Sequence, residues 1–223
     1  MASEFVTPRE YNQLSPLYYD NLLKSKNPLR KAFHNGRFIF TKNLVRKYLA
    51  NKDEVIVDLA CGSCNWNNEG FNVIGVDVAV DMLKHAKRQG RIKKALIEEC
   101  FNTSNKDKKA MIVVMTELLE HLLEPEKTIR EARRILSENG VVICSVPYDV
   151  NLSLWKPLFK LLCFYEGTIL AKEYFKKEAG HVNHFNRRTI KKLFIKNGFN
   201  IEFVKIKYLM TIFLVCRKDS KVL

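Results

Sequence analysis

Hydrophobic and polar positions follow two different patterns along this chain. Short apolar runs, typical of buried parallel strands, occur at 55–59, 73–76 and 141–146, and further strands are expected at 94–98 and 111–115. Apolar residues recur at helical spacing over 8–50, with a break at Pro28, and over 81–89, 125–137 and 188–197. Because strands alternate with helices, the pattern predicts an α/β fold with a mostly parallel, doubly wound sheet.

The end of the chain departs from this alternation. Two strand-like segments, 201–207 and 210–217, follow one another almost without a break. A connection that short can only join antiparallel strands. The sequence therefore predicts a parallel sheet that ends in a C-terminal antiparallel hairpin.

Composition limits the class of protein. The 223 residues are 47% hydrophobic and include 14 Phe and 8 Tyr, which supports one domain with a sizeable core and excludes a disordered chain. Six Cys without a secretory signal indicate reduced thiols and a cytoplasmic location. The most apolar late stretch, 152–170, is interrupted by charged residues, Pro157 and Gly167, so no membrane-spanning helix is expected.

Charge is distributed unevenly. The formal net charge is +14, and residues 151–223 hold 15 Lys and Arg against 5 Asp and Glu, whereas 55–150 is nearly neutral. Basic flanks attract an anionic partner such as a nucleic acid, an acidic membrane surface or a phosphorylated substrate. A purely solubilising surface is an equally good interpretation.

One candidate site follows the first predicted strand. The segment Asp58–Cys64 reads as a tight turn whose backbone approaches a ligand at the carboxyl end of the strand. Asp77 ends the second strand, nineteen residues after Asp58, which is the spacing of a carboxylate that accepts hydrogen bonds from a ribose diol. These residues indicate a dinucleotide or another adenosine compound.

Several ordered motifs then resemble one family. They are the strand and turn Val55–Gly62, the strand Ile74–Asp77, the segment Glu117–Leu122 (Glu-Leu-Leu-Glu-His-Leu), the helix after Pro125, the strand end Ser145-Val146-Pro147, and Gly180–Phe185. This set is similar to the class I S-adenosylmethionine-dependent methyltransferases of the small-molecule and ubiquinone-biosynthesis branch. The resemblance runs from about Val55 to Arg217.

The resemblance implies a seven-stranded Rossmann-like methyltransferase fold that binds S-adenosyl-L-methionine. It implies a cofactor site made of Asp58, Ala60, Gly62, Asp77, Val78, Met82, Met115, Thr116 and Glu117, with Glu98, Glu99 or Asn102 at the adenine edge. His121 and His184 are the candidate catalytic bases. Ala60 and Cys64 stand where the family has glycines, and the first helix after the turn is expected to shrink to one turn at 65–69.

The organisation expected from these observations is an N-terminal helical extension, 1–54, and a methyltransferase domain, 55–223, with a lid-like insertion at about 148–186. The insertion interleaves Trp155, Phe159 and Phe164 with lysines. This composition suits a greasy or anionic substrate or an anionic membrane surface with peripheral attachment. A helical cap on the sheet edge is the simpler alternative.

The function expected is methyl transfer to a small-molecule or lipid-like acceptor, on oxygen. An RNA methyltransferase that uses the basic flanks is favoured less, and a catalytically degenerate binding protein is the third alternative. Cys61 and Cys64 form a single C-x-x-C pair without a second pair, so no metal site is expected.

Overall fold

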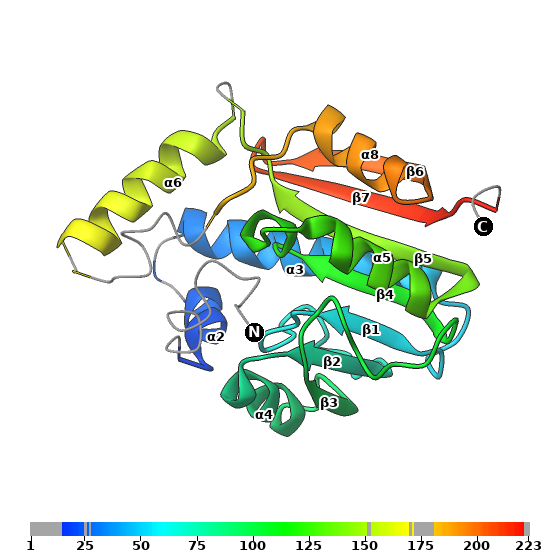
Figure 1. Ribbon diagram of the computed structural model, residues 1–223. Helices are drawn as coiled ribbons and strands as arrows, with labels where there is room; N and C mark the ends of the chain where they lie inside the picture. The colour runs from blue at the N-terminus through cyan, green and yellow to red at the C-terminus, as the bar shows by residue number, and fades with distance from the viewer. Residues whose placement is uncertain are drawn as a thin grey trace.

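The computed structural model describes residues 15–24, 26, 28–150, 153–169, 171 and 181–220. These residues form a seven-stranded sheet in the order β3-β2-β1-β4-β5-β7-β6 (Figure 1). The strands are β1 (Ile56–Leu59), β2 (Val73–Asp77), β3 (Lys94–Ile97), β4 (Ala110–Thr116), β5 (Leu136–Pro147), β6 (Phe199–Lys207) and β7 (Thr211–Lys218). Strands β1 to β5 pair in parallel, and β7 pairs antiparallel with both β5 and β6. The α/β sheet and its terminal hairpin are confirmed.

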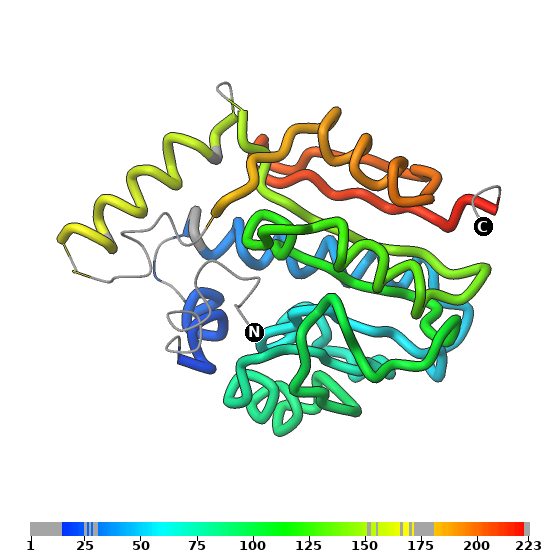
Figure 2. Tube along the Cα trace, viewed as in Figure 1, coloured from blue at the N-terminus to red at the C-terminus, as the bar shows by residue number. Residues whose placement is uncertain are grey.

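Helices cover both faces of this sheet. On one face, α5 (Pro125–Ile135) and α8 (Arg187–Lys196) bury Ile129, Ile190 and Phe194 against the strands. On the other face lie α3 (Pro28–Tyr48) and α4 (Val80–Arg88), which bury Val45 and Leu83. Figure 2 traces the chain through these two layers. This two-sided covering explains why the central strands β1 and β4 are almost entirely apolar.

The N-terminal helices pack on the sheet. The break expected at Pro28 is confirmed, since α2 (Tyr18–Leu23) ends before it and α3 begins at it, where a missing N–H costs nothing. Phe40 of α3 packs edge-on against Phe213 with 4.7 Å between ring centroids, and the Tyr48 hydroxyl donates to Glu202 Oε1 over 2.9 Å. The domain boundary at residue 54 stays a prediction, and residues 8–14 of the expected helix lie outside the described part.

Two local expectations were wrong. Asn65 and Trp66 lie in a turn and 67–69 are irregular, so the expected helical turn at 65–69 is absent. The helix predicted over 125–137 ends at Ile135, and β5 already begins at Leu136, so Asn139-Gly140 lies inside a strand. The register shifts there, and a Cβ on Gly140 would lie 2.8 Å from the Met111 carbonyl oxygen. The glycine therefore permits close contact between the strands.

The segment after β5 projects from the carboxyl end of the sheet (Figure 1). It holds α6 (Trp155–Cys163) and a π-helical continuation, η2 (Phe164–Ile169). Exposed apolar side chains cover it: Leu154, Leu158, Leu161, Phe164, Tyr165 and Ile169. Among the described residues, no helix combines the length and the apolar character that crossing a bilayer requires.

Candidate functional site

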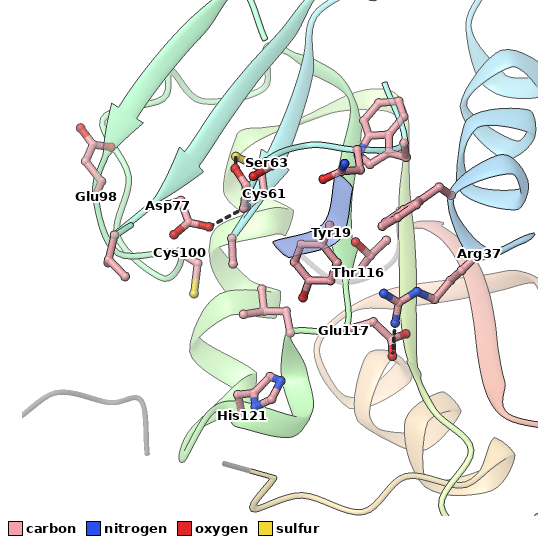
Figure 3. Close-up of a pocket in the computed structure, with 17 residues that line it drawn as sticks. Tyr19, Arg37, Cys61, Ser63, Asp77, Glu98, Cys100, Thr116, Glu117 and His121 are labelled. Carbon is pink, nitrogen blue, oxygen red and sulfur yellow. Dashed lines mark hydrogen bonds and ion pairs between the residues drawn. The ribbon is translucent and has the colours of Figure 1, made fainter. Parts of the chain in front are cut away.

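A cavity opens where β1, β2 and β4 end, at the carboxyl edge of the sheet beneath α2 and α3 (Figure 3). It holds about 960 Å³, its open mouth included. This is the position where open α/β sheets bind ligands. Its walls are formed by Tyr19, Arg37, Phe38, Ala60, Cys61, Gly62, Ser63, Asn65, Trp66, Asp77, Val78, Glu98, Cys100, Thr116, Glu117, Leu118 and His121.

The loop after β1 has an unusual backbone. Ala60, Gly62 and Cys64 all have positive φ, at 55°, 52° and 45°. The Cys61 N–H donates to the Val76 carbonyl over 3.0 Å, which ties the loop to β2. Two residues with side chains thus adopt the left-handed conformation that glycine reaches without strain.

Asp77 is a buried carboxylate in the cavity wall that two backbone N–H groups hold in place. Its Oδ2 accepts from the Gly62 N–H over 2.7 Å, and its Oδ1 accepts from the Ala79 N–H over 2.8 Å. Each carboxylate oxygen can accept more than one hydrogen bond, so this buried carboxylate keeps capacity for a ligand. Val78 also lines the cavity, beside Asp77.

Asp58 lies behind the cavity wall. Its Oδ2 accepts from the Trp66 indole N–H over 2.7 Å and from the Cys64 thiol over 3.4 Å. Its Oδ1 is buried and receives no hydrogen bond from the residues that the structure describes. Burial raises the pKa of Asp58 to about 7, against the hydrogen bonds that favour its charged form. Met82 and Met115 are likewise buried, at 1% and 0% exposure, and do not reach the cavity.

An ion pair between Arg37 of α3 and Glu117, the residue after β4, forms the floor of the cavity. Arg37 Nη1 lies 2.9 Å from Glu117 Oε2, and the Ser145 hydroxyl donates to Glu117 Oε1 over 2.7 Å. Figure 3 shows the Arg37–Glu117 pair across the cavity from Asp77. Glu117 itself has a φ of 51°, so its position depends on these two partners. Thr116 precedes it in the same wall.

Helix α2 supplies the remaining wall through Tyr19. The next residue, Asp20, is within 2.6 Å of His85 Nε2, 2.7 Å of Arg91 Nη2 and 2.6 Å of Asn65 Nδ2. Burial acts to raise the pKa of Asp20, but the hydrogen bonds from Arg91 and His85 outweigh it and the pKa is lowered. Burial raises the pKa of the Tyr19 phenol to about 12, so this hydroxyl stays neutral.

The two candidate bases do not share a cavity. His121 lines the main cavity, whereas His184 is exposed and hydrogen-bonds through Nδ1 to Asp149 beside a second, smaller cavity. The ring that contacts His121 belongs to His181, with centroids 4.8 Å apart. The backbone carbonyl of Glu120 accepts from the N–H groups of Val182 and Asn183, which brings these two motifs together.

Glu120 completes a group that could hold a cation. Both of its carboxylate oxygens are buried and accept no hydrogen bond within the described part of the chain. Burial and the neighbouring Glu117 raise its pKa well above the ordinary value. Ligand atoms of Glu120, His121 and His181 lie within 4.8 Å of one another, and carboxylate and imidazole are ordinary metal ligands.

Comparison with known proteins decides the family. A family model described as a methyltransferase domain matches residues 31–203. The chain belongs to this family. Its fold agrees: a solved structure from Pyrococcus horikoshii superposes with a TM-score of 0.66 at 20% identity, over 94% of this chain and 99% of that one.

Curated relatives of this methyltransferase are distant. A demethylmenaquinone methyltransferase of Staphylococcus epidermidis is 21% identical over 73% of this chain and 74% of its own length. A ubiquinone biosynthesis O-methyltransferase of Hydrogenovibrio crunogenus is 26% identical over 60% of this chain and 57% of its own. Together with the matched domain, these relatives show that the chain is a class I methyltransferase and that S-adenosylmethionine is its cofactor.

The cavity fits such a cofactor, since a buried carboxylate with spare acceptor capacity faces a left-handed loop at the carboxyl edge of the sheet. Of the three adenine-edge candidates, Glu98 lines the cavity and Glu99 and Asn102 do not. Sequence reasoning included Ser63 in the candidate loop but missed the cavity residues Tyr19, Arg37, Phe38, Asn65, Trp66 and Cys100. No local motif marks the first three, which reach the site only through the packing of α2 and α3.

Proposed function

We propose that this methyltransferase methylates an oxygen of a small-molecule or lipid-like acceptor. Asp77 carries the proposal, because its buried carboxylate at the end of β2 suits the two hydroxyl groups of a ribose. Val78 and Glu98 would flank the adenine, and Ala60 and Gly62 the methionine half. Asp58, Met82 and Met115 would support these walls from behind.

When bound, S-adenosylmethionine supplies a methyl group activated by a sulfonium. The chain's own task is to place an acceptor in line with that group and to exclude water. Thr116 and the Arg37–Glu117 pair would form the floor against which the acceptor lies. We assign to the His121 imidazole the removal of the acceptor proton, because it lines the same cavity. The second candidate, His184, would act only on acceptor groups in the smaller cavity.

The acceptor class is supported by three observations. One distant relative is named a demethylmenaquinone methyltransferase and another a ubiquinone biosynthesis O-methyltransferase, which favours a quinone-like acceptor and transfer to oxygen. Apolar side chains cover the exposed side of α6 next to the site. Lysines on the same helix suit an anionic membrane surface, with RNA as the less favoured partner.

The test of the site is Asp77→Asn. Losing one of two charged acceptors of ribose hydroxyls should weaken S-adenosylhomocysteine binding by about 2 kcal/mol, roughly thirtyfold. Calorimetry measures the affinity, and thermal unfolding checks that the variant folds. An unchanged affinity in the folded variant would remove Asp77 from the cofactor site, and a wild-type chain that binds no cofactor would indicate a degenerate relative.

The reaction itself is tested with methyl-labelled S-adenosylmethionine and fractions of a cell extract. We expect label in the lipid or small-molecule fraction, and less of it with His121→Gln. Label confined to RNA would favour the alternative acceptor.

A further inference from the structure

A second cavity lies between α6 and the loop at 181–184, and nothing in the proposed cofactor site accounts for it. It holds about 390 Å³, its open mouth included. Lys156 and Lys160 line it from one face of α6, one helical turn apart. His184 lines it from the loop, and Asp149 after β5 is its one acidic residue among the residues that the structure describes.

The charges in this cavity are unbalanced. Asp149 is shared between His184, which hydrogen-bonds to it, and Lys156, whose Nζ lies 3.6 Å from its Oδ1. No carboxylate of the described residues lies within ion-pair distance of Lys160. Among the described residues, the cavity therefore presents two ammonium groups and the imidazoles of His181 and His184 against a single carboxylate.

The loop is fixed before any ligand arrives. The N–H groups of Val182 and Asn183 donate to the Glu120 carbonyl over 2.8 and 3.0 Å, and the Asn183 amide donates to the Leu119 carbonyl over 3.1 Å. Because these bonds anchor the loop to the wall of the cofactor cavity, the position of His184 relative to that cavity is set.

The two cavities meet at a pair of rings. His121 lines the first, His181 lines the second, and their centroids are 4.8 Å apart. Phe159 stacks on His181 with 4.7 Å between centroids and 14° between planes. A ligand anchored at the lysines would thus run along an aromatic wall toward His121.

We propose that the second cavity binds a phosphate group of the methyl acceptor. The two lysines and the His184 imidazole suit a dianionic phosphate, whose three oxygens each accept an N–H, better than they suit a neutral hydroxyl. The acceptor is then a phosphate monoester with an aromatic or apolar body, either a soluble molecule or a lipid headgroup. The identification of the ligand as the methyl acceptor rests on the proposed function, whereas the phosphate site rests on the geometry of the second cavity.

The experiment uses the full chain and two double variants with equal loss of charge. Lys156→Gln with Lys160→Gln alters the cavity, and Lys191→Gln with Lys192→Gln on the exposed side of α8 is the control. Phenyl phosphate is the soluble probe, measured by calorimetry. Phosphatidylcholine vesicles with and without phosphatidic acid probe the lipid source. S-adenosylhomocysteine reports on the first cavity.

We expect the α6 double variant to bind phenyl phosphate at least about tenfold more weakly, while the control binds like the wild type. Both should bind S-adenosylhomocysteine normally. If wild type binds phenyl phosphate but not S-adenosylhomocysteine, the cofactor proposal fails and the phosphate site stands. Three results would overturn the phosphate-site proposal. They are equal affinity for phenyl phosphate in the wild type and the α6 variant, an equal loss of affinity in the control, and binding of an RNA oligonucleotide without any binding of phenyl phosphate. Preference for phosphatidic acid vesicles over phenyl phosphate would identify the lipid source.

Discussion

At the scale of single residues, the loop after β1 shows how a site can keep its backbone while losing its glycines. Ala60 and Cys64 stand at positions where glycine is usual in the resembled family, yet both keep a positive φ. The left-handed conformation costs a residue with a Cβ about 1 kcal/mol relative to glycine. The chain therefore stores strain at the cavity wall, as functional sites often do.

This strain can be measured with Ala60→Gly. Relief of about 1 kcal/mol in the folded state is partly offset by the greater freedom of glycine in the unfolded chain, so the net stability should rise by less than about 1 kcal/mol. Binding of S-adenosylhomocysteine should be intact or tighter. Denaturant unfolding and calorimetry are the measurements, and a clear loss of stability would show that the Ala60 methyl contributes packing that outweighs its strain.

Cys64→Gly is the informative counterpart. Cys64 is buried and its thiol donates to Asp58, so this change removes packing and a hydrogen bond together with the strain. We expect a net loss of about 1–2 kcal/mol. If both glycine variants stabilise the protein equally, the thiol contributes nothing.

At the scale of elements, one side chain of α2, Asp20, supplies three polar contacts that join this helix to the site. This helix has six residues, too few to be stable alone, and Asp20 joins it to His85, Arg91 and Asn65. Tyr19 on the same helix lines the cofactor cavity. Asp20 therefore positions a wall of the site without touching a ligand.

Asp20→Ala should release α2 locally. Leaving Arg91 and His85 without their carboxylate costs the docked state about 2–3 kcal/mol. Hydrogen exchange in residues 18–23 should speed up while the sheet stays protected, and S-adenosylhomocysteine should bind several-fold more weakly. Asn21→Ala, an exposed change on the same helix, is the control. Faster exchange throughout the sheet would mean that Asp20 supports the whole fold.

The pH dependence of this contact has a definite sign. Because the pKa of Asp20 is lowered, its stabilising contribution is present above the ordinary aspartate pKa and disappears as the pH falls through the lowered value. The docked helix is thus expected to persist at neutral pH and to detach only in acid.

The exposed side of α6 is the second element with a testable role. Leu158 and Leu161 of α6 and Phe164 at the start of η2 are 49%, 64% and 58% exposed. Their change to Ser should abolish salt-sensitive binding to anionic vesicles. Ile97, Leu123 and Ile195 are similarly exposed elsewhere, so their change to Ser is the matched control. Co-sedimentation is the measurement, and equal binding by both variants would make α6 only a cap.

The structure changes which residues suit this test. The side chain of Trp155 lies outside the described residues. Phe159 stacks on His181 in the second cavity, so its loss would disturb a site as well as a surface. Leu158, Leu161 and Phe164 are exposed, so changing them tests the surface without removing the Phe159–His181 contact of the second cavity.

At the scale of the whole molecule, the sequence predicted what depends on burial and missed what depends on packing between distant segments. Apolar runs located β1, β2 and β4, and Asp58, Gly62 and Asp77 follow from their position at strand ends. The start of β5 at Leu136 was missed because the three residues that follow, Ser137, Glu138 and Asn139, are polar and not buried. Arg37 and Tyr19 have no local signal, since they reach the cavity only when their helices pack on the sheet.

The stability of the whole molecule should depend on pH through two kinds of carboxyl group, whose effects on the free energy of unfolding have opposite signs. Burial raises the pKa of Asp58 from 3.8 to about 7, so the folded protein binds a proton there that the unfolded chain releases above about pH 4. This contribution is fully present below the unfolded pKa and is lost as the pH rises toward 7, a change of up to about 4 kcal/mol. Asp20 and Glu131, whose pKa values are lowered, act in the opposite direction and lose their contribution in acid.

We therefore expect maximal stability at mildly acidic pH and a decline from about pH 4 to pH 7 that Asp58→Asn removes. The amide can still accept from the Trp66 indole, so the variant should fold, and it should be less dependent on pH in that range. Denaturant unfolding monitored by tryptophan fluorescence across the pH range is the measurement. Asp81→Asn, an exposed change on α4, is the control. A decline of the same size in the Asp58 variant would mean that another buried carboxyl, with Glu120 the first candidate, holds the proton.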